Sequence, residues 1–407
     1  MMTVKKICES SIICVLFFVM FLLSSCTTQL PRNEGYETVE SNILKMNAIP
    51  SIVWENYVFN ELRSVTYNRA TGEMTMGLCE NVECEGSCVF HKGHMVPKQA
   101  IDGVLYFVFE GRGEGVRYYC SKDILTGEIK VHLSVDYDDI TPSDAMFVED
   151  GYIYYSRKYL KEGGNPSLPD DYATFVCRVP ITGGESETVY QMRGNSETLY
   201  VIADGMMLTG WEGAYHRIEL DTLQSKQLLA LQENEIFSVA ERQYFKGKLY
   251  FLAKPEQSLV TTPNGQPVHQ LRLAYLDTMT GEWGYLVDVP VLTYQVCDDA
   301  IYFSPVEIHQ VNDPEIYAPT DPKGAKYLLG SSTLYACDHD GSNLRAVYTD
   351  QSHTLDFVES YTIADGVLYG WICEFDFEAN KFGEIFFAEI HLDTGDVIRP
   401  SSINDMR

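Results

Sequence analysis

A signature of two turns recurs seven times along this chain and limits the folds that it can adopt. The first turn is Asp-Gly, or a substitute pair, followed by aromatic and aliphatic residues, as in Asp102-Gly103-Val104-Leu105-Tyr106. The second turn, some tens of residues later, is of the Thr-Gly type, such as Thr126-Gly127. Repeats at this spacing are typical of circular or solenoid arrays.

The order of turns and strands within each repeat predicts four antiparallel strands. The first turns fall at a mean step of about 50 residues, which is the size of a propeller blade, near Asn56, Gly103, Gly151, Gly205, Gly247, Asp299 and Gly366. Glycine in such turns supplies the positive φ that tight hairpins require. We therefore expect an all-β protein, with a single seven-bladed β-propeller of four-stranded antiparallel blades over residues 46–407.

The N-terminal residues predict export. A basic start precedes an apolar run, Ile12–Leu23, which is too short for a comfortable membrane span and fits a signal peptide. The run ends at Leu23-Ser24-Ser25-Cys26, which resembles the lipobox of bacterial lipoproteins. By that resemblance residues 1–25 are a lipoprotein signal peptide, Cys26 carries the lipid, and residues 26–45 are a flexible tether. An ordinary secretory signal with an accidental Cys is the alternative.

The charge of the chain limits its partners. The formal net charge is −28 at pH 7, whereas nucleic acids and anionic lipids attract basic surfaces. We therefore expect no nucleic-acid partner and no membrane contact other than a lipid anchor on the outer face of the cell membrane. We also expect a monomer. Basic ligands or cations are favoured by such a field.

Long insertions fall at the same place in three repeats. They lie between the second and third strands, in residues 157–171, 254–270 and 304–332, and their Pro, Gly, Asp and Asn content predicts loops. If the first strand of each blade is innermost, these loops and the connections between blades share one face. Insertions in repeat proteins collect on the binding face, so we expect the binding surface there.

A cluster of thiols and imidazoles lies between the first two repeats. Cys79, Cys84, Cys88 and His91 are close enough in sequence to hold a soft metal ion such as Zn²⁺ in a structural site. A disulfide with one Cys left over and three free thiols are the alternatives. Three further cysteines in apolar strands, Cys120, Cys177 and Cys337, are expected to be buried thiols.

The repeats together with this motif resemble a known group of proteins. A Tyr-Asn-Arg-Ala-Thr-Gly-Glu turn leads to Leu78-Cys79, then Cys84, with another Cys and a His behind. This pattern is similar to exported lipoproteins of Clostridia-type bacteria, whose propeller repeats look like those of TolB-like and low-density-lipoprotein-receptor-type propellers. In that group the His usually follows the second Cys, whereas here His91 follows Cys88. The resemblance implies a propeller and an exported location, and no assigned activity.

Two further groups of side chains are candidate ligand sites. Asp136 and Asp138 offer oxygens to a cation such as Ca²⁺, although the full EF-hand spacing is missing. Trp211 and Trp371 each follow a Gly in the same register of two repeats, and an exposed indole there would stack on a sugar or aromatic ligand. Packing between blades is the alternative for both tryptophans.

The function that we expect from the sequence is binding. The chain contains no Gly-x-Ser-x-Gly, no His-Glu-x-x-His and no phosphate-binding loop. A propeller offers a rigid disc with a variable loop face, which suits a platform for a protein, peptide or glycan. Two alternatives remain: a carbohydrate-active lyase or hydrolase with acidic residues at the channel mouth, and a structural subunit of an envelope complex.

Overall fold

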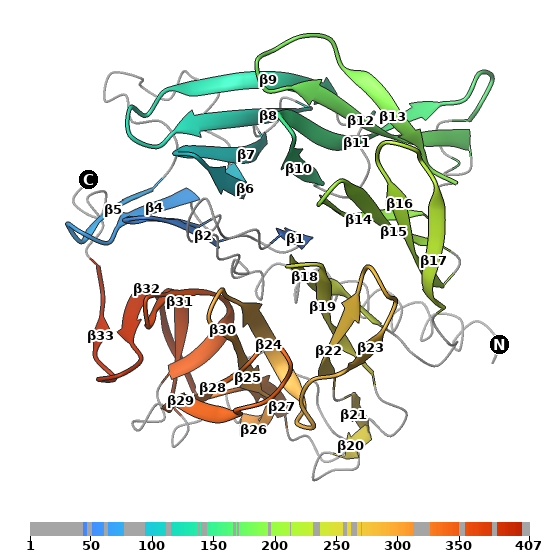
Figure 1. Ribbon diagram of the computed structural model, residues 1–407. Helices are drawn as coiled ribbons and strands as arrows, with labels where there is room; N and C mark the ends of the chain where they lie inside the picture. The colour runs from blue at the N-terminus through green and yellow to red at the C-terminus, as the bar shows by residue number, and fades with distance from the viewer. Residues whose placement is uncertain are drawn as a thin grey trace, which may run out of the picture.

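The computed structural model describes residues 44–46, 51–60, 64–76, 94–110, 115–136, 139, 145–165, 168, 171–193, 197–211, 213–230, 237–254, 259–261, 267–269, 271–311, 326–349, 355–376 and 381–400. Seven antiparallel β-sheets are arranged in a ring, which Figure 1 shows along its axis. The expected seven-bladed propeller of four-stranded blades is confirmed. None of the described residues forms a helix that is long and apolar enough to cross a membrane.

Each blade uses four consecutive main strands, ordered from the centre of the ring to its rim. They are β2 (Ser51–Trp54), β3 (Tyr57–Asn60), β4 (Val65–Asn68) and β5 (Glu73–Met76) in blade 1; β6 (His94–Ile101), β7 (Val104–Glu110), β8 (Val116–Asp123) and β9 (Ile129–Asp136) in blade 2; β10 (Met146–Glu149), β11 (Tyr152–Leu160), β12 (Tyr172–Pro180) and β13 (Glu187–Gln191) in blade 3; β14 (Thr198–Ala203), β15 (Met206–Trp211), β16 (Ala214–Glu219) and β17 (Ser225–Ala230) in blade 4; β18 (Phe237–Phe245), β19 (Lys248–Ala253), β22 (Arg272–Asp277) and β23 (Trp283–Tyr285) in blade 5; β24 (Val291–Val296), β25 (Ile301–Pro305), β28 (Thr333–Cys337) and β29 (Arg345–Thr349) in blade 6; and β30 (Leu355–Ala364), β31 (Val367–Asp376), β32 (Lys381–His391) and β33 (Val397–Ile398) in blade 7.

The antiparallel order gives the disc two distinct faces. The first turn of each blade joins its first and second strands, and the second turn joins its third and fourth strands, so both turns lie on one face, called here the turn face. The connections between second and third strands, and those between blades, lie on the opposite face, called here the loop face.

The first turns explain why Asp-Gly recurs in the sequence. In blade 2 the two central residues, Asp102 and Gly103, have φ values of 49° and 78°. Two positive φ values in a two-residue hairpin define a type I′ turn, whose twist matches that of the flanking strands. Asp and Gly tolerate this left-handed region better than other residues. Blades 3, 4, 5 and 7 repeat the same pair of positive φ values, at Asp150-Gly151, Asp204-Gly205, Lys246-Gly247 and Asp365-Gly366.

The hydrophobic core lies between the blades. One cluster of buried side chains runs through blades 1 to 5 and includes Trp54, Leu105 and Phe147. Smaller clusters join blade 6 to blade 7 and blade 7 to blade 1. The thiols of Cys120, Cys177 and Cys337 are buried in this core and form no disulfide, so the expectation for these three is confirmed.

Glutamine side chains join the innermost strands of neighbouring blades. Gln243 of β18 donates from Nε2 to the carbonyl oxygen of Tyr294 over 2.9 Å, and its Oε1 accepts from the backbone N–H of Val296 over 2.7 Å. Gln99 of β6 accepts from the N–H of Val148 over 3.0 Å in the same way. Both glutamines stand three residues before a first turn. The repeat therefore places an inter-blade hydrogen bond at a constant register position.

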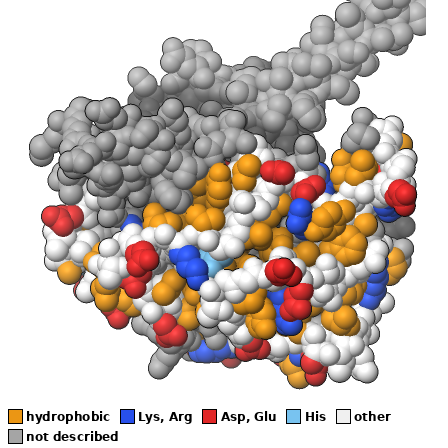
Figure 2. Space-filling model, turned by 90° about the horizontal axis from the view of Figure 1, so that it is seen from above, with side chains coloured by type: hydrophobic (Ala, Val, Ile, Leu, Met, Phe, Trp, Pro, Cys, Tyr) orange, Lys and Arg blue, Asp and Glu red, His pale blue; other side chains and the backbone are white. Residues whose placement is uncertain are grey.

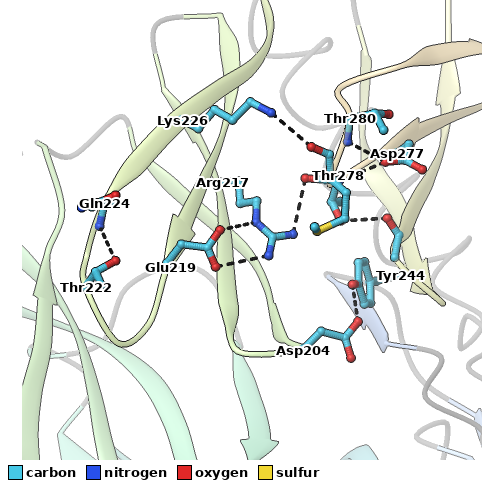
Figure 3. A network of polar contacts seen from close by, with 12 residues as sticks. Asp204, Arg217, Glu219, Thr222, Gln224, Lys226, Tyr244, Asp277, Thr278 and Thr280 are labelled. Atoms are coloured by element: carbon cyan, nitrogen blue, oxygen red, sulfur yellow. Dashed lines mark hydrogen bonds and ion pairs between the residues drawn. The ribbon is translucent and has the colours of Figure 1, made fainter.

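Polar side chains on the turn face join blades 4 and 5, as Figure 3 shows. The hydroxyl of Tyr244 on β18 donates to the carboxylate of Asp204 in the first turn of blade 4 over 2.5 Å. Burial, reinforced by this hydrogen bond, raises the pKa of Tyr244, so the phenol keeps its proton and remains a donor. Arg217 on β16 is held by Glu219 and donates to the carbonyl oxygen of Thr278 over 3.5 Å.

Among the described strands, no sheet combines strands from the N-terminal and the C-terminal parts of the chain. All four strands of blade 1 come from the N-terminal part, and all four of blade 7 come from the C-terminal part. Closure depends on side chains that cross between the two blades. Trp371 donates from Nε1 to Oδ1 of Asn60 over 3.2 Å, and Tyr67 donates its hydroxyl proton to Glu389 over 2.5 Å.

A short strand that precedes blade 1 lies at the centre of the ring (Figure 1). This strand, β1 (Leu44–Met46), pairs antiparallel with β18 of blade 5, with Leu44 opposite Tyr244 and Met46 opposite Arg242. It also contacts β14 and β6. Leu44 and Lys45 were expected in a flexible tether and belong to a strand instead. The physical reason is that β18 offers an unused backbone edge at the centre of the ring.

The three insertions are not simple loops. In blade 3 the strands β11 and β12 continue outward as a long hairpin that pairs as far as Leu160 and Tyr172. The insertion of blade 5 contains the hairpin of β20 (Leu259–Thr261) and β21 (Pro267–His269), and that of blade 6 contains β26 (Glu307–Val311) and β27 (Lys326–Gly330). Their turn residues were interpreted as loops, but such residues also close hairpins between short strands.

Candidate functional site

Several candidate residues lie outside the described part of the chain. These are Cys26, the four members of the thiol and imidazole cluster (Cys79, Cys84, Cys88 and His91), and Asp138. Their roles stay predictions. Within the described ranges, no three His, Cys, Asp or Glu side chains come together as a group that would hold a metal ion. Asp136 is exposed at the end of β9, and the neighbouring Asp139 forms an ion pair with Arg157 at 2.7 Å.

The two candidate tryptophans occupy different environments. Trp371 is 3 % exposed, and its indole packs against Phe387 with ring centres 6.0 Å apart while donating to Asn60 of blade 1. Trp371 therefore packs between blades, which was the alternative to ligand binding, and it presents no stacking surface. Trp211 is only partly buried, at the loop-face end of β15.

Trp211 is part of a cluster at the junction of blades 3 and 4, called here the Trp211 cluster and made of Tyr190, Arg193, Glu197, Thr209, Trp211 and His216. The guanidinium carbon of Arg193 lies 5.1 Å from the centre of the Trp211 ring. His216 lies 6.0 Å from the same indole, tilted by 54°. Arg193 also donates to Oγ of Ser225 over 2.5 Å. The exposed guanidinium is thus held in place by an aromatic face and a hydroxyl.

A buried carboxylate positions this arginine. Glu197 is 4 % exposed and accepts hydrogen bonds from the backbone N–H of Arg193 over 2.5 Å and from the hydroxyl of Thr209 over 2.7 Å. The hydroxyl of Tyr190 on β13 adds a longer contact of 3.3 Å. Since buried carboxylates are stable only when hydrogen-bonded, Glu197 fixes the connection from blade 3 to blade 4 and with it the direction of Arg193.

The chemistry of the Trp211 cluster suits recognition of a ligand. An exposed guanidinium pairs well with carboxylates, and an adjacent indole offers an apolar face. The carboxylate of Glu197 is already satisfied by three donors, so it is poorly placed as an acid or base. These groups therefore fit binding of an anionic or aromatic group better than its conversion.

The long hairpin of blade 3 provides a second cluster on the loop face. The guanidinium carbon of Arg157 lies 4.6 Å from the ring centre of Tyr159, whose ring meets Phe175 edge-on at 5.6 Å. At its end the hairpin exposes Tyr159, Leu160 and Leu168 by 38 %, 43 % and 52 %. Figure 2 shows the nearby rim of the disc, where hydrophobic side chains are interspersed with both signs of charge. Exposed apolar side chains at a projecting hairpin are typical of a contact surface.

One pair of side chains in blade 2 has the composition of a nucleophile and its base. Ser121 Oγ lies 2.8 Å from His132 Nε2. Burial, with the charge of Lys130, lowers the pKa of His132 to about 4, which makes its imidazole a weak base at neutral pH. Ser121 is 7 % exposed, and no described carboxylate forms an ion pair with His132. The burial of Ser121 and the weak basicity of His132 make this pair unlike the accessible Ser–His pair of a serine hydrolase.

Comparisons with known proteins support the fold. No protein-family model and no curated protein sequence matches the chain. Similar solved structures include a prolyl endopeptidase, with a TM-score of 0.50 and 10 % identity over 85 % of this chain and 46 % of that one. An acylaminoacyl peptidase in complex with Z-Gly-Gly-Phe-chloromethyl ketone has a TM-score of 0.49 and 11 % identity over 94 % of this chain and 54 % of that one.

This chain spans about half the length of those two peptidases. TolB from Acinetobacter baumannii is also similar, with a TM-score of 0.30 and 12 % identity over 76 % of this chain and 69 % of that one. At these identities the likeness shows the propeller fold alone. The Clostridia-type origin and the lipoprotein character stay predictions.

Proposed function

We propose that this protein is a lipid-tethered binding platform on the outer face of the cell membrane, and that it binds a protein, peptide or glycan through the loop face of its propeller. The lipid at Cys26 and the exported location rest on the signal sequence. The propeller contributes a rigid scaffold, since its blades are joined by buried clusters and by hydrogen bonds between neighbouring strands.

The observation that carries this proposal is the placement of the extra hairpins. Blades 3, 5 and 6 each carry one between their second and third strands, and antiparallel order directs all of these to the loop face. The turn face, by contrast, has short turns that repeat nearly unchanged. Variable insertions on one face of a repeated scaffold are typical of a recognition surface.

Arrays of glycans and peptides test the proposal directly. We expect the mature protein to bind a restricted set of ligands. Leu160→Ser together with Leu168→Ser should weaken that binding about tenfold or more if the exposed hairpin contributes contact area. Leu125→Ser is the matched control, because Leu125 is 75 % exposed on the turn face. Equal loss in the control would contradict a loop-face site.

The two other functions are separate outcomes of the same screen. Turnover of a polysaccharide by the protein would replace the binding role with a lyase or hydrolase. If no ligand binds on either array and an envelope protein copurifies stably, the structural subunit would be favoured. Among the described residues, Glu197 is the one acidic side chain that is buried, and its satisfied hydrogen bonds favour the binding role.

A further inference from the structure

The strand β1 adds to a blade to which it does not belong by chain order. Of the sheets that the described residues form, the one in blade 5 has five strands, in the order β1-β18-β19-β22-β23, while each other blade has four. The pairing is antiparallel, with Leu44, Lys45 and Met46 opposite Tyr244, Gln243 and Arg242. The inner edge of β18 is therefore able to accept another extended chain.

Inner strands of a propeller need partners for this edge. Each has one neighbour in its own blade, so its second edge presents backbone N–H and C=O groups toward the axis of the ring. The side chain of Gln99 in blade 2 reaches such a group at Val148 of blade 3, and that of Gln243 in blade 5 reaches two, at Tyr294 and Val296 of blade 6. In blade 5 a backbone strand does so instead. The edge of β18 thus differs from its neighbours in the kind of partner that it takes.

The strand that occupies this edge forms only a short ladder. β1 covers three residues opposite Arg242, Gln243 and Tyr244, whereas β18 runs from Phe237 to Phe245, with an irregularity between Phe237 and Arg242. A ladder this short adds few hydrogen bonds, and a longer extended segment that continues past the irregularity toward Phe237 would form more of them. A segment that forms more backbone hydrogen bonds with β18 can therefore replace β1.

The charges at the end of β1 indicate which partner is favoured. Leu44 lies opposite Tyr244, next to the first turn of blade 5, so this end of β1 lies at the turn face. The first turn of blade 5 carries the exposed Lys246, but the first turns of the other blades carry exposed acidic residues, which outnumber it: Glu55, Asp102, Asp150, Asp204, Asp299 and Asp365. Because first turns join the innermost strands, these carboxylates surround the axis of the ring. A basic segment approaching from the turn face is attracted by them.

We propose that the inner edge of β18 is a strand-addition site for an extended, basic polypeptide segment that approaches from the turn face, and that β1 occupies this site until such a segment replaces it. The inference extends the proposed binding function by naming a second site and a ligand class. It does not require the loop face, so the two proposals fail independently.

The test compares the mature protein with a variant that carries Leu44→Pro and Lys45→Pro. Successive N–H groups of a strand point to opposite sides, so one of the two prolines removes a donor toward β18. The probe is a labelled peptide with the sequence of residues 41–49, which has one Lys and no acidic residue. Two control peptides have the same length: one carries alternate N-methyl groups that block strand pairing, and one carries Lys45→Glu.

We expect the probe to bind the proline variant about tenfold more tightly than the unaltered protein, because the competing strand is removed. The N-methylated peptide should not bind, and the Lys45→Glu peptide should bind more weakly. Hydrogen exchange should show new protection at residues 242–244. Equal binding of the methylated peptide, or protection of a different inner strand, would overturn the proposal.

A second measurement applies if the proline variant does not fold. Excess probe is then added to the unaltered protein, and hydrogen exchange is followed at residues 44–46. Replacement predicts faster exchange there, while residues 242–244 stay protected. Unchanged exchange at residues 44–46 with a saturating probe contradicts a replaceable strand. Array ligands that bind through the loop face in the same preparation would leave the proposed function standing.

Discussion

The side chain of Gln243 forms two hydrogen bonds with the backbone around Tyr294 in the next blade, donating to the Tyr294 carbonyl over 2.9 Å and accepting from the N–H of Val296 over 2.7 Å. A carboxamide has the same donor and acceptor as a peptide group. The side chain of Gln243 therefore forms the two hydrogen bonds that a residue of a neighbouring strand would form, between two sheets that share no paired strands. Neighbouring blades are thereby held in register at the axis of the ring.

Replacing Gln243 tests this relationship. Gln243 is 3 % exposed, and Gln243→Leu leaves one backbone donor and one acceptor buried without their partner, so we expect a loss of about 2–4 kcal/mol in the free energy of unfolding. Urea unfolding measures it. Gln227→Leu is the control, since Gln227 is exposed on β17 and should change stability by less than about 0.5 kcal/mol. Equal effects would show that the carboxamide contributes nothing specific.

Two glycines distinguish backbone strain from contact between blades. Gly341 and Gly151 have similar φ values, +85° and +77°, but a Cβ at Gly341 would lie 2.3 Å from the carbonyl oxygen of Leu286 in blade 5, whereas a Cβ at Gly151 would meet nothing within 4 Å. Gly151→Ala should cost about 1–2 kcal/mol from the left-handed conformation alone. Gly341→Ala should cost clearly more, measured by thermal or urea unfolding. Similar losses would mean that the second turn of blade 6 moves away easily.

The carboxylate beneath the Trp211 cluster is expected to matter more than an exposed one. Glu197→Gln keeps the shape but replaces one acceptor oxygen with a donor among three donor groups, so we expect a loss of about 2 kcal/mol or more. Glu187→Gln is the comparison, because Glu187 pairs with Arg178 on an exposed surface and such pairs contribute at most about 1 kcal/mol. Ligand binding at the cluster should fall with Glu197→Gln even under conditions where the variant is fully folded.

His132 predicts a specific dependence of stability on pH. Its pKa is lowered to about 4 from the ordinary 6.5 by burial and by the charge of Lys130. The unfolded chain therefore binds this proton first as the pH falls, and stability is lost between pH 6.5 and pH 4. Each pKa unit corresponds to about 1.4 kcal/mol before screening by solvent, which reduces it at this half-buried position.

The comparison that isolates this effect is the difference between the protein and His132→Asn. The difference in unfolding free energy should be constant above pH 7 and should shift in favour of the variant as the pH falls toward 4. Ser121→Ala keeps the imidazole and should retain the pH dependence of the unaltered protein. A pH-independent difference for His132→Asn would show that the imidazole titrates as it does in the unfolded chain.

Buried thiols should resist alkylation in the folded protein. Burial raises the pKa of Cys120 to about 12, and burial with the neighbouring Asp338 raises that of Cys337 to about 11, so little reactive thiolate exists at pH 8. We expect iodoacetamide to modify Cys120, Cys177, Cys297 and Cys337 only after unfolding. Peptide mapping by mass spectrometry measures this. Rapid modification of Cys120 under native conditions would contradict its place in the core.

The repeat explains how much of the fold was predictable. Asp-Gly pairs define type I′ turns through local backbone conformation, so the number and order of blades followed from residues such as Asp102 and Gly103. The insertions were harder to interpret because Pro, Gly and Asn close short hairpins as well as loops. The pairing of β1 with β18 was not predictable, since residues 44–46 and 242–244 are distant in the sequence and come together only when the blades close into a ring.

The Trp211 cluster was predicted only in part. Trp211 was identified by its register after a Gly, but Arg193 and Glu197 were missed because they belong to the connection between two blades. A carboxylate directly before the first strand of blade 4, close to an arginine, was the available signal. The register that Trp211 shares with Trp371 was misleading, because in blade 7 the same position faces Asn60 of blade 1.

The central claim is that this propeller binds its ligand without changing it. The measurement is recovery of a ligand selected from the arrays, after prolonged incubation with the mature protein and release, followed by mass spectrometry of the ligand. The account predicts that the ligand returns with its mass unchanged and that Leu160→Ser with Leu168→Ser reduces its capture. A shortened or chemically altered ligand, formed in proportion to protein and time, would contradict it.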